Sequence, residues 1–152
     1  MSRTFLDTNI LVYADQPTSA FHGTARETLL ALEAADEELW ISPQVIREYL
    51  SVVIRPDASR PEEAPLPPQA AVDAATHFLA TFWLAGEDQD VSRRLLDLIA
   101  RYGVRGRLVN DANIVATMLT HGIPRLLTFN ARDFRRFGDL IEIMALGASE
   151  NG

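Results

Sequence analysis

The chain alternates short apolar runs with longer segments in which apolar residues recur at helical spacing. The short runs are typical of buried strands. They cover residues 4–6, 39–41, 82–84, 125–129 and 140–144. The helical segments cover residues 19–35, 43–55, 68–81, 91–102, 109–120 and, more briefly, 131–137. Alternating strands and helices predict an α/β fold, a three-layer α/β/α domain with a central, mainly parallel five-stranded sheet.

Two connecting segments have a clear composition. Thr8 and Asn9 follow the first strand and predict a polar turn, after which the apolar residues 10–13 return to the core. Residues 56–68 hold five of the eight prolines, which predicts an irregular surface loop too short to separate two domains.

Length and composition indicate one soluble domain. The 152 residues are 47% apolar, so we expect a single domain over 1–146 and a short tail over 147–152. With no cysteine, disulfides, thiolate zinc sites and a cysteine nucleophile are excluded. No signal peptide is evident, and the longest later apolar run, 78–85, is far short of the roughly 20 residues that span a bilayer. These features predict a cytoplasmic protein without a membrane partner.

The charged residues are unevenly distributed. All 14 basic residues are arginine, which excludes a Walker A phosphate loop and a lysine base. The net charge of −7 divides into −10 over residues 1–90 and +3 over 91–152, so the C-terminal part is the candidate for contact with a polyanion. The alternative is that these arginines are solvated on helix surfaces. The candidates are Arg93, Arg94, Arg105, Arg107, Arg132 and Arg135, together with Arg101 and Arg136.

Four acidic residues stand out by position. Asp7 ends the first strand inside an apolar run, where an unpaired carboxylate is costly to bury. Asp111 opens an apolar helix and Asp133 follows the fourth strand, so helix capping is an alternative role for both. Glu48 lies within the helix predicted over 43–55, where a solvated face residue is the alternative.

Taken together, the four acids predict a metal site. The first strand is normally central in a doubly wound sheet, and the segments after its neighbours converge on one crevice. Clustered carboxylates raise one another's pKa unless a cation joins them, and oxygen ligands suit Mg²⁺ or Mn²⁺. The chemistry that such a site favours is metal-assisted phosphodiester hydrolysis.

Four sequence motifs carry a family resemblance. They are FLDTNILVY at 5–13, SPQVIREY at 42–49, NDANIVA at 110–116 and LTFNARDF at 127–134. Their order and spacing resemble the PIN-domain nucleases across essentially the whole chain, and most of all the VapC-type toxins of bacterial toxin–antitoxin pairs. The resemblance implies a Mg²⁺- or Mn²⁺-dependent endoribonuclease, usually a homodimer held inactive by a small VapB-type antitoxin.

The resemblance also implies roles for particular residues. It places the metal-binding, catalytic acids at Asp7, Glu48, Asp111 and Asp133. We expect Asp7 and Asp111 to hold the principal ion, and Glu48 to orient the attacking water or help hold a second ion. Asp133 then binds through water. Polar residues expected to hydrogen-bond to these ligands, or to act as ordinary turn and cap residues, are Thr8, Asn9, Thr128 and Asn130.

Other functions stay open. A haloacid-dehalogenase-type phosphatase or a receiver domain resembles the chain at Asp7, but the phosphatase pattern needs an acid at Asn9 and both classes use a lysine. A PIN-fold RNA-processing nuclease that is not a toxin, and a non-catalytic RNA- or protein-binding module, are the nearer alternatives. The three histidines form no site by spacing. Trp40, Phe82 and Trp83 are predicted to lie in the core.

Overall fold

Five parallel strands form a single sheet in the computed structural model, which describes residues 2–56 and 64–147. The strands are β1 (Arg3–Leu6), β2 (Glu38–Ile41), β3 (Trp83–Leu84), β4 (Arg125–Thr128) and β5 (Glu142–Ala145). Their order is β3-β2-β1-β4-β5, and β1 is central, with Phe5 paired to Trp40 of β2 and to Leu126 of β4. The predicted α/β fold with a parallel five-stranded sheet is confirmed, and its strands are parallel throughout.

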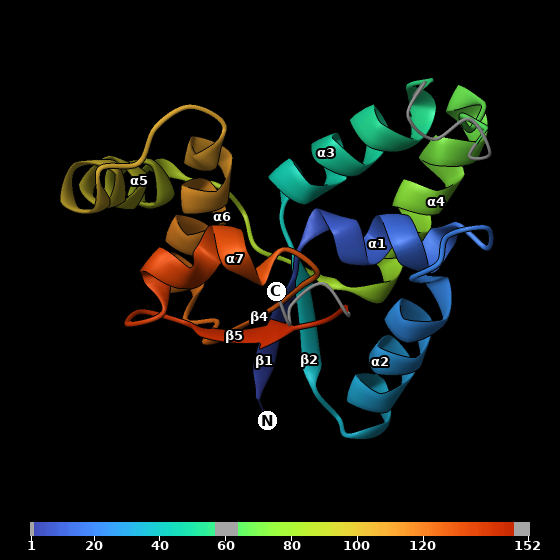
Figure 1. Cartoon of the computed structure of the whole chain (residues 1–152), viewed down its shortest axis with the longest axis horizontal. Coiled ribbons are helices and arrows are strands. Elements are labelled where there is room, and N and C mark those ends of the chain that lie inside the picture. The colour runs from blue at the N-terminus through green and yellow to red at the C-terminus, as the bar shows by residue number, and fades with distance from the viewer. Residues whose placement is uncertain (1, 57–63, 148–152) are drawn as a thin grey trace.

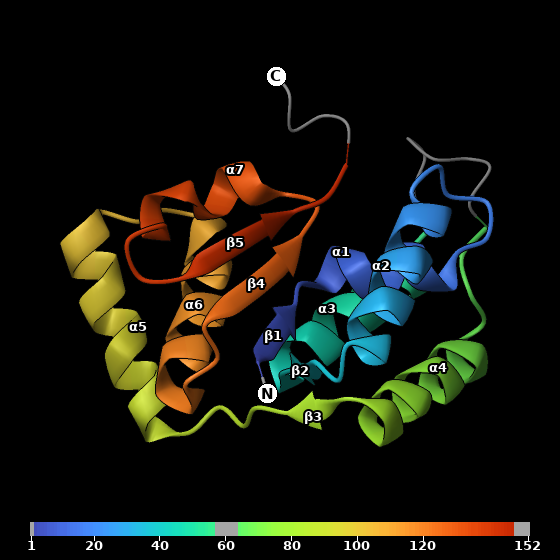
Figure 2. The same ribbon diagram turned by 90° about the horizontal axis from the view of Figure 1, so that it is seen from below.

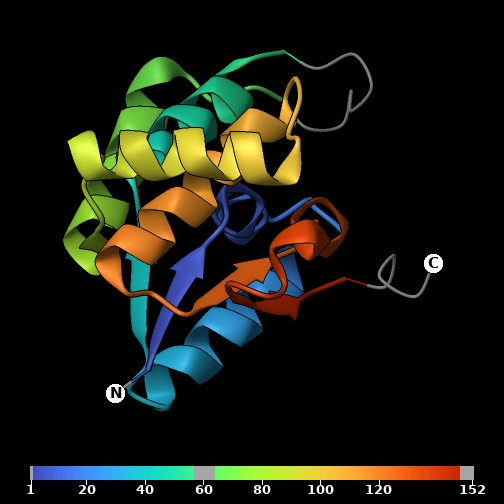
Figure 3. The same cartoon turned by 90° about the vertical axis from the view of Figure 1, so that its left-hand side faces the viewer.

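Helices lie to both sides of this sheet. They are α1 (Thr8–Asp15), α2 (His22–Ala34), α3 (Pro43–Ile54), α4 (Pro68–Thr81), α5 (Gln89–Tyr102), α6 (Leu108–His121) and α7 (Ala131–Phe134), which runs into a 3-10 turn (Arg135–Phe137). Figures 1 and 2 show α1–α4 gathered at one side of the strands and α5–α7 at the other. Figure 3 looks onto α5, in yellow, which lies across α6, in orange.

The start of α1 differs from the prediction. Thr8 and Asn9 form no polar turn, because α1 begins at Thr8 directly after β1. Asp7 is the N-cap residue, and its Oδ1 accepts a hydrogen bond from the backbone N–H of Thr8 at 2.8 Å. A carboxylate that caps the helix makes an intervening turn unnecessary. The same side chain is thereby fixed at the carboxyl end of the central strand.

The core is built around β1 and α6. Phe5 and Leu6 are fully buried, as are Val115 and Met118 on α6. The burial of α6 explains why its sequence is apolar on nearly all sides after the first turn. Burying a side chain of this size stabilises a fold by about 1.5–3 kcal/mol, so these residues anchor the end of β1 firmly.

The prediction that Trp83 lies in the core is wrong. Its side chain is 59% exposed, and its ring stacks on that of Trp40 with centroids 5.7 Å apart. β3 is an edge strand of two residues, so it has a neighbour, β2, on one side only. Trp40 and Phe82 are partly buried and pack against the core.

Some sequence predictions fall outside the described residues. These include residues 57–63 of the proline-rich segment and residues 148–152 of the predicted tail. The division into a domain over 1–146 and a tail stays a prediction. Within the described ranges, none of the helices has the length and apolar character needed to cross a membrane.

Candidate active site

Asp7 is the most firmly held acid at the carboxyl end of the sheet. Only 7% of the residue is exposed, and its Oδ2 accepts hydrogen bonds from Thr128 Oγ1 at 2.7 Å and from Asn9 Nδ2 at 3.3 Å. Burial raises the pKa of Asp7, while the bonds from Thr128 and the Thr8 N–H oppose that rise by favouring the ionised form. The pKa of Asp7 is raised on balance, and the hydrogen bonds hold the carboxylate in one orientation.

Glu48 reaches the same place from α3. Its Oε1 accepts a hydrogen bond from Gln44 Nε2 at 2.9 Å, one helical turn earlier. Burial is the main cause that raises the pKa of Glu48; Gln44 lowers it and the nearby charge of Asp7 raises it. A raised pKa makes this carboxylate a stronger base, which suits the role of a general base.

Asp111 lies in the first turn of α6, where three other acids act on its pKa. Burial, and then the charges of Asp7, Asp133 and Glu48, raise its pKa to about 7. Arg107 lies close enough to lower the pKa, but its effect is the smallest of these. This cluster of acids therefore repels itself in the absence of a cation.

Asp7, Glu48 and Asp111 line one cavity of about 260 Å³. Its other lining residues are Thr8, Asn9, Val12, Tyr13, Val52 and Asn130. Asp133 is half-buried on α7 and does not line the cavity, although its charge raises the pKa of both Asp7 and Asp111. Three of the four predicted acids thus share the cavity wall, and the fourth acts on them from nearby.

The predicted supporting residues contact the site in different ways. Asn9 spans two segments, because its Nδ2 donates to Asp7 and its Oδ1 accepts the N–H of Phe129 at 3.2 Å. Thr128 Oγ1 donates to Asp7 and accepts the N–H of Asn130 at 2.9 Å. Thr8 binds Asp7 through its backbone N–H. Asn9, Thr128 and Asn130 therefore tie the loop after β4 to the start of α1.

The donor set fits a hard divalent cation. All charged groups on the cavity wall are carboxylates, whose oxygens suit Mg²⁺ and Mn²⁺. Among the described residues, no three His, Cys, Asp or Glu side chains are close enough together to hold one ion. Mg²⁺ commonly uses only one or two carboxylates and keeps several waters, so two of these acids suffice.

The predicted RNA-contacting arginines are all exposed, and none of them lines the cavity. Arg93 and Arg94 lie on α5, where Arg93 pairs with Asp90 at 3.2 Å. Arg105 and Arg107 precede α6. Arg132 belongs to α7, and Arg135 and Arg136 to the following 3-10 turn, while Arg101 lies 3.7 Å from Asp139. Arg107 connects this set to the acids, because its charge lowers the pKa of Asp111.

Two side chains at the site were not predicted from the sequence. Gln44 is buried and binds Glu48, and Asn113 Nδ2 donates to Gln44 Oε1 at 2.7 Å. Both residues lie inside motifs that point to the site. Spacing could have suggested Gln44, because it precedes Glu48 by four positions on one helix face. No sequence pattern indicates that Asn113 faces Gln44 from another helix.

Comparison with known proteins places this arrangement in a family. The family model for the PIN domain matches residues 4–140. The chain belongs to the PIN-domain family. Two curated relatives of this PIN domain, both from Mycobacterium tuberculosis, are named Ribonuclease VapC48 and Ribonuclease VapC24. VapC48 is 33% identical over 148 residues, which cover 90% of this chain and 92% of the relative. VapC24 is 28% identical over 134 residues, which cover 88% of this chain and 90% of the relative.

A solved structure agrees on the fold of this PIN domain. VapBC2 from Rickettsia felis, bound to a DNA fragment from its promoter, has a chain that is 22% identical with a TM-score of 0.67. The match covers 95% of this PIN domain and 99% of that chain. The resemblance to PIN-domain nucleases of the VapC type is therefore confirmed. Metal dependence is a general property of these ribonucleases.

Proposed function

We propose that this PIN domain is a VapC-type endoribonuclease that hydrolyses phosphodiester bonds in RNA with Mg²⁺ or Mn²⁺. The observation that carries the proposal is the cavity that Asp7, Glu48 and Asp111 line together, in which Asp111 has its pKa raised to about 7. Kinship with proteins named Ribonuclease VapC supports the same chemistry. A homodimer remains a prediction from the family.

We assign a role to each acid. Asp7 and Asp111 would hold the ion, and Glu48, on the same cavity wall, would add to the affinity for it, orient the attacking water and accept its proton. Asp133 contributes through water and through its charge. When bound, a divalent cation activates water and offsets the negative charge that develops on the phosphate. Thr128 and Asn9 hold Asp7 in one orientation while this happens.

The proposal predicts a simple metal requirement. Purified protein should cleave single-stranded RNA when Mn²⁺ or Mg²⁺ is added, and an excess of EDTA should remove the activity, by about a thousandfold or more, because the acids alone cannot neutralise the phosphate. Gel analysis of a labelled RNA measures this. Restoring Mn²⁺ after EDTA is the control for irreversible damage. Cleavage that persists in EDTA would contradict the proposed chemistry.

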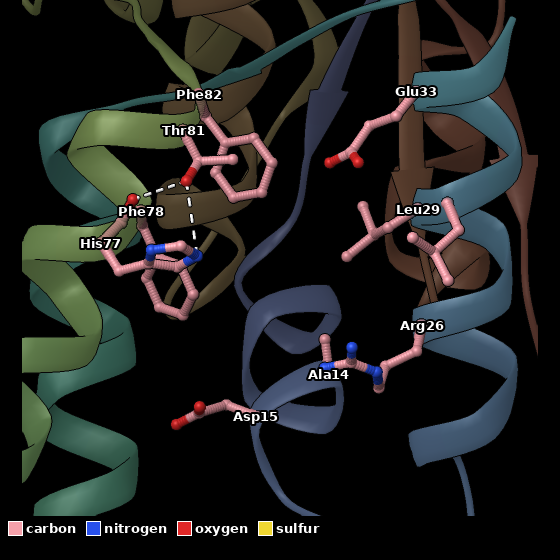
Figure 4. A pocket seen from close by; sticks show the side chains of 10 residues that line it. Ala14, Asp15, Arg26, Leu29, Glu33, His77, Phe78, Thr81 and Phe82 are labelled. Atoms are coloured by element: carbon pink, nitrogen blue, oxygen red, sulfur yellow. Dashed lines mark hydrogen bonds between the residues drawn. The ribbon is translucent and has the colours of Figure 1, made fainter.

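We further propose that a small antitoxin protein binds along a groove between α2 and α4. Figure 4 shows the first of two pockets in this groove, where side chains of α2 and α4 face one another across the end of α1. This pocket, of about 390 Å³, is lined by Ala14, Asp15, Arg26, Leu29, Leu30, Glu33, His77, Phe78, Thr81 and Phe82. A second pocket, of about 410 Å³, shares Glu33, Thr81 and Phe82 and adds Asp36, Glu37, Glu38, Leu39 and Trp83.

The chemistry of the groove fits a partner with apolar and basic side chains. Leu30 and Trp83 are more than half exposed there, so an apolar partner residue would remove them from water. Glu37 already pairs with Arg125 at 3.0 Å, but Glu33 and Asp36 make no ion pair with any described residue. These two carboxylates are therefore available to arginine or lysine of a partner, in agreement with the excess of acids over residues 1–90.

A charge reversal tests the groove. Glu33→Arg should weaken binding of a candidate VapB-type antitoxin at least about tenfold, because one attractive contact becomes repulsive. Glu27→Arg makes the same change on the exposed side of α2, outside both pockets, and should leave affinity nearly unaltered. Calorimetric titration at two salt concentrations measures both. Equal losses of affinity in the two variants, or an affinity that is the same at both salt concentrations, would count against this location.

A further inference from the structure

Gln44 is a buried amide that joins the two helices carrying Glu48 and Asp111. The residue is 5% exposed on the first turn of α3. Its Nε2 donates to Glu48 Oε1 at 2.9 Å and to the carbonyl oxygen of Asn110 at 2.8 Å. Its Oε1 accepts from Asn113 Nδ2 at 2.7 Å. Both amide hydrogens and the carbonyl oxygen therefore have partners, which fixes the orientation of the side chain.

These bonds connect elements that otherwise contact each other little. α3 packs mainly against α1 and α4, whereas α6 packs mainly against α5. Gln44 is hydrogen-bonded to α6 at Asn110 and Asn113, which lie on either side of Asp111 in the sequence. The relative placement of Glu48 and Asp111 therefore depends on this bridge rather than on a broad helix interface. A displacement of about 1 Å in a catalytic group can cost about a hundredfold in rate.

The backbone of Gln44 is fixed as well. Its backbone N–H donates to Glu87 Oε1 at 2.9 Å, and Glu87 lies 3.7 Å from Arg47 through its other oxygen. This contact holds the first turn of α3 to the segment before α5. Gln44 donates to Oε1 of Glu48, and Glu48 itself lines the cavity.

We propose that Gln44 is a positioning residue, which holds the Glu48 carboxylate in register with Asp111 by bridging α3 and α6. The inference rests on the proposed nuclease function, since it assigns Glu48 and Asp111 to one reaction. Gln44 itself does not line the cavity, so it acts through Glu48 and not by touching RNA.

Gln44→Met tests this role, because methionine has a similar length but cannot form the three side-chain bonds. We expect kcat for RNA cleavage to fall about 10- to 100-fold with KM within about twofold, and Mn²⁺ affinity to fall several-fold. The matched control is Gln69→Met. Gln69 donates to Asp73 at 2.9 Å with the same four-residue spacing, exposed on α4, and its loss should change neither quantity.

A double-mutant cycle separates positioning from a general structural role. In a Glu48→Ala background, Gln44→Met should reduce Mn²⁺ affinity much less than it does in the wild type, because the carboxylate that it positions is gone. Equal reductions in both backgrounds would overturn the proposal. Unchanged kcat and Mn²⁺ affinity in Gln44→Met would overturn it too, while leaving the nuclease function standing if the wild type cleaves RNA.

A second variant covers the case in which Gln44→Met does not fold. Asn113→Ala removes only the bond to Gln44 Oε1 and leaves both donated bonds possible. A fall in kcat that is smaller than the one in Gln44→Met, again without a change in KM, would support the bridge. If Asn113→Ala keeps the kcat and the Mn²⁺ affinity of the wild type, the bridge is contradicted. If the wild type itself does not cleave RNA, the proposed function fails, and the Mn²⁺ measurements still decide the role of Gln44.

Discussion

Asp7→Asn is expected to reduce metal-dependent RNA cleavage by about a thousandfold or more while the protein remains folded. The substitution removes the charge at the carboxyl end of the central strand, where we place the ion. Loss of several kcal/mol of electrostatic stabilisation in the transition state corresponds to this factor. The fold should persist because asparagine Oδ1 can still accept the N–H of Thr8 and so cap α1.

The measurement is RNA cleavage under single-turnover conditions together with thermal unfolding. Asp88→Asn is a matched control, because Asp88 caps α5 in the same way by accepting the N–H of Val91 at 3.1 Å, and it does not line the cavity. That variant should retain wild-type cleavage. Near-normal cleavage by Asp7→Asn, with unchanged Mn²⁺ affinity, would refute the assignment of the site.

Asp111→Asn is expected to have two opposite effects. Cleavage should again fall by about a thousandfold, since a metal-holding charge is lost. The metal-free protein should become more stable at pH 8, by about 1 kcal/mol or about 3 °C in Tm, because the removed anion is repelled by Asp7, Asp133 and Glu48. We set this figure well below the full effect of the pKa shift, because the side chain is partly exposed.

The sign of the pH dependence follows from the raised pKa of Asp111. A carboxyl group whose pKa is about 7 when folded and 3.8 in its ordinary state holds its proton more tightly in the folded protein. The metal-free wild type therefore loses stability as the pH rises from about 4 through 7, and Asp111→Asn should lose less. Thermal unfolding between pH 5 and 8 measures the difference. Asp90→Asn, an exposed acid in the first turn of α5, is the control.

Metal binding should show the converse dependence. A cation competes with the proton for Asp111, so Mn²⁺ affinity of the wild type should rise about tenfold between pH 6 and pH 8. Titration calorimetry in buffers of different ionisation enthalpy should also detect proton release. An affinity that is flat over this range would show that Asp111 is already ionised in the metal-free protein.

The sequence predicts most of the strands and helices because buried apolar residues recur at the spacing of each kind of element. Apolar spacing located all five strands and most helices, and the rule for doubly wound sheets placed β1 in the centre and Asp7 at its carboxyl end. It failed at Trp83, since an aromatic residue in a short apolar run gives no sign that its strand is an edge. It also failed at Thr8, where capping by Asp7 replaced the expected turn.

What the sequence determined by itself is therefore the five strands, most of the helices, the family and the acids that follow the strands. The tertiary structure decided which of those acids share a cavity, bringing Asp7, Glu48 and Asp111 to its wall and leaving Asp133 off it. It also decided that Gln44 meets Asn110, 66 residues away. The physical reason is that periodicity records which face of an element is buried, whereas the partner across that face depends on how separate elements pack.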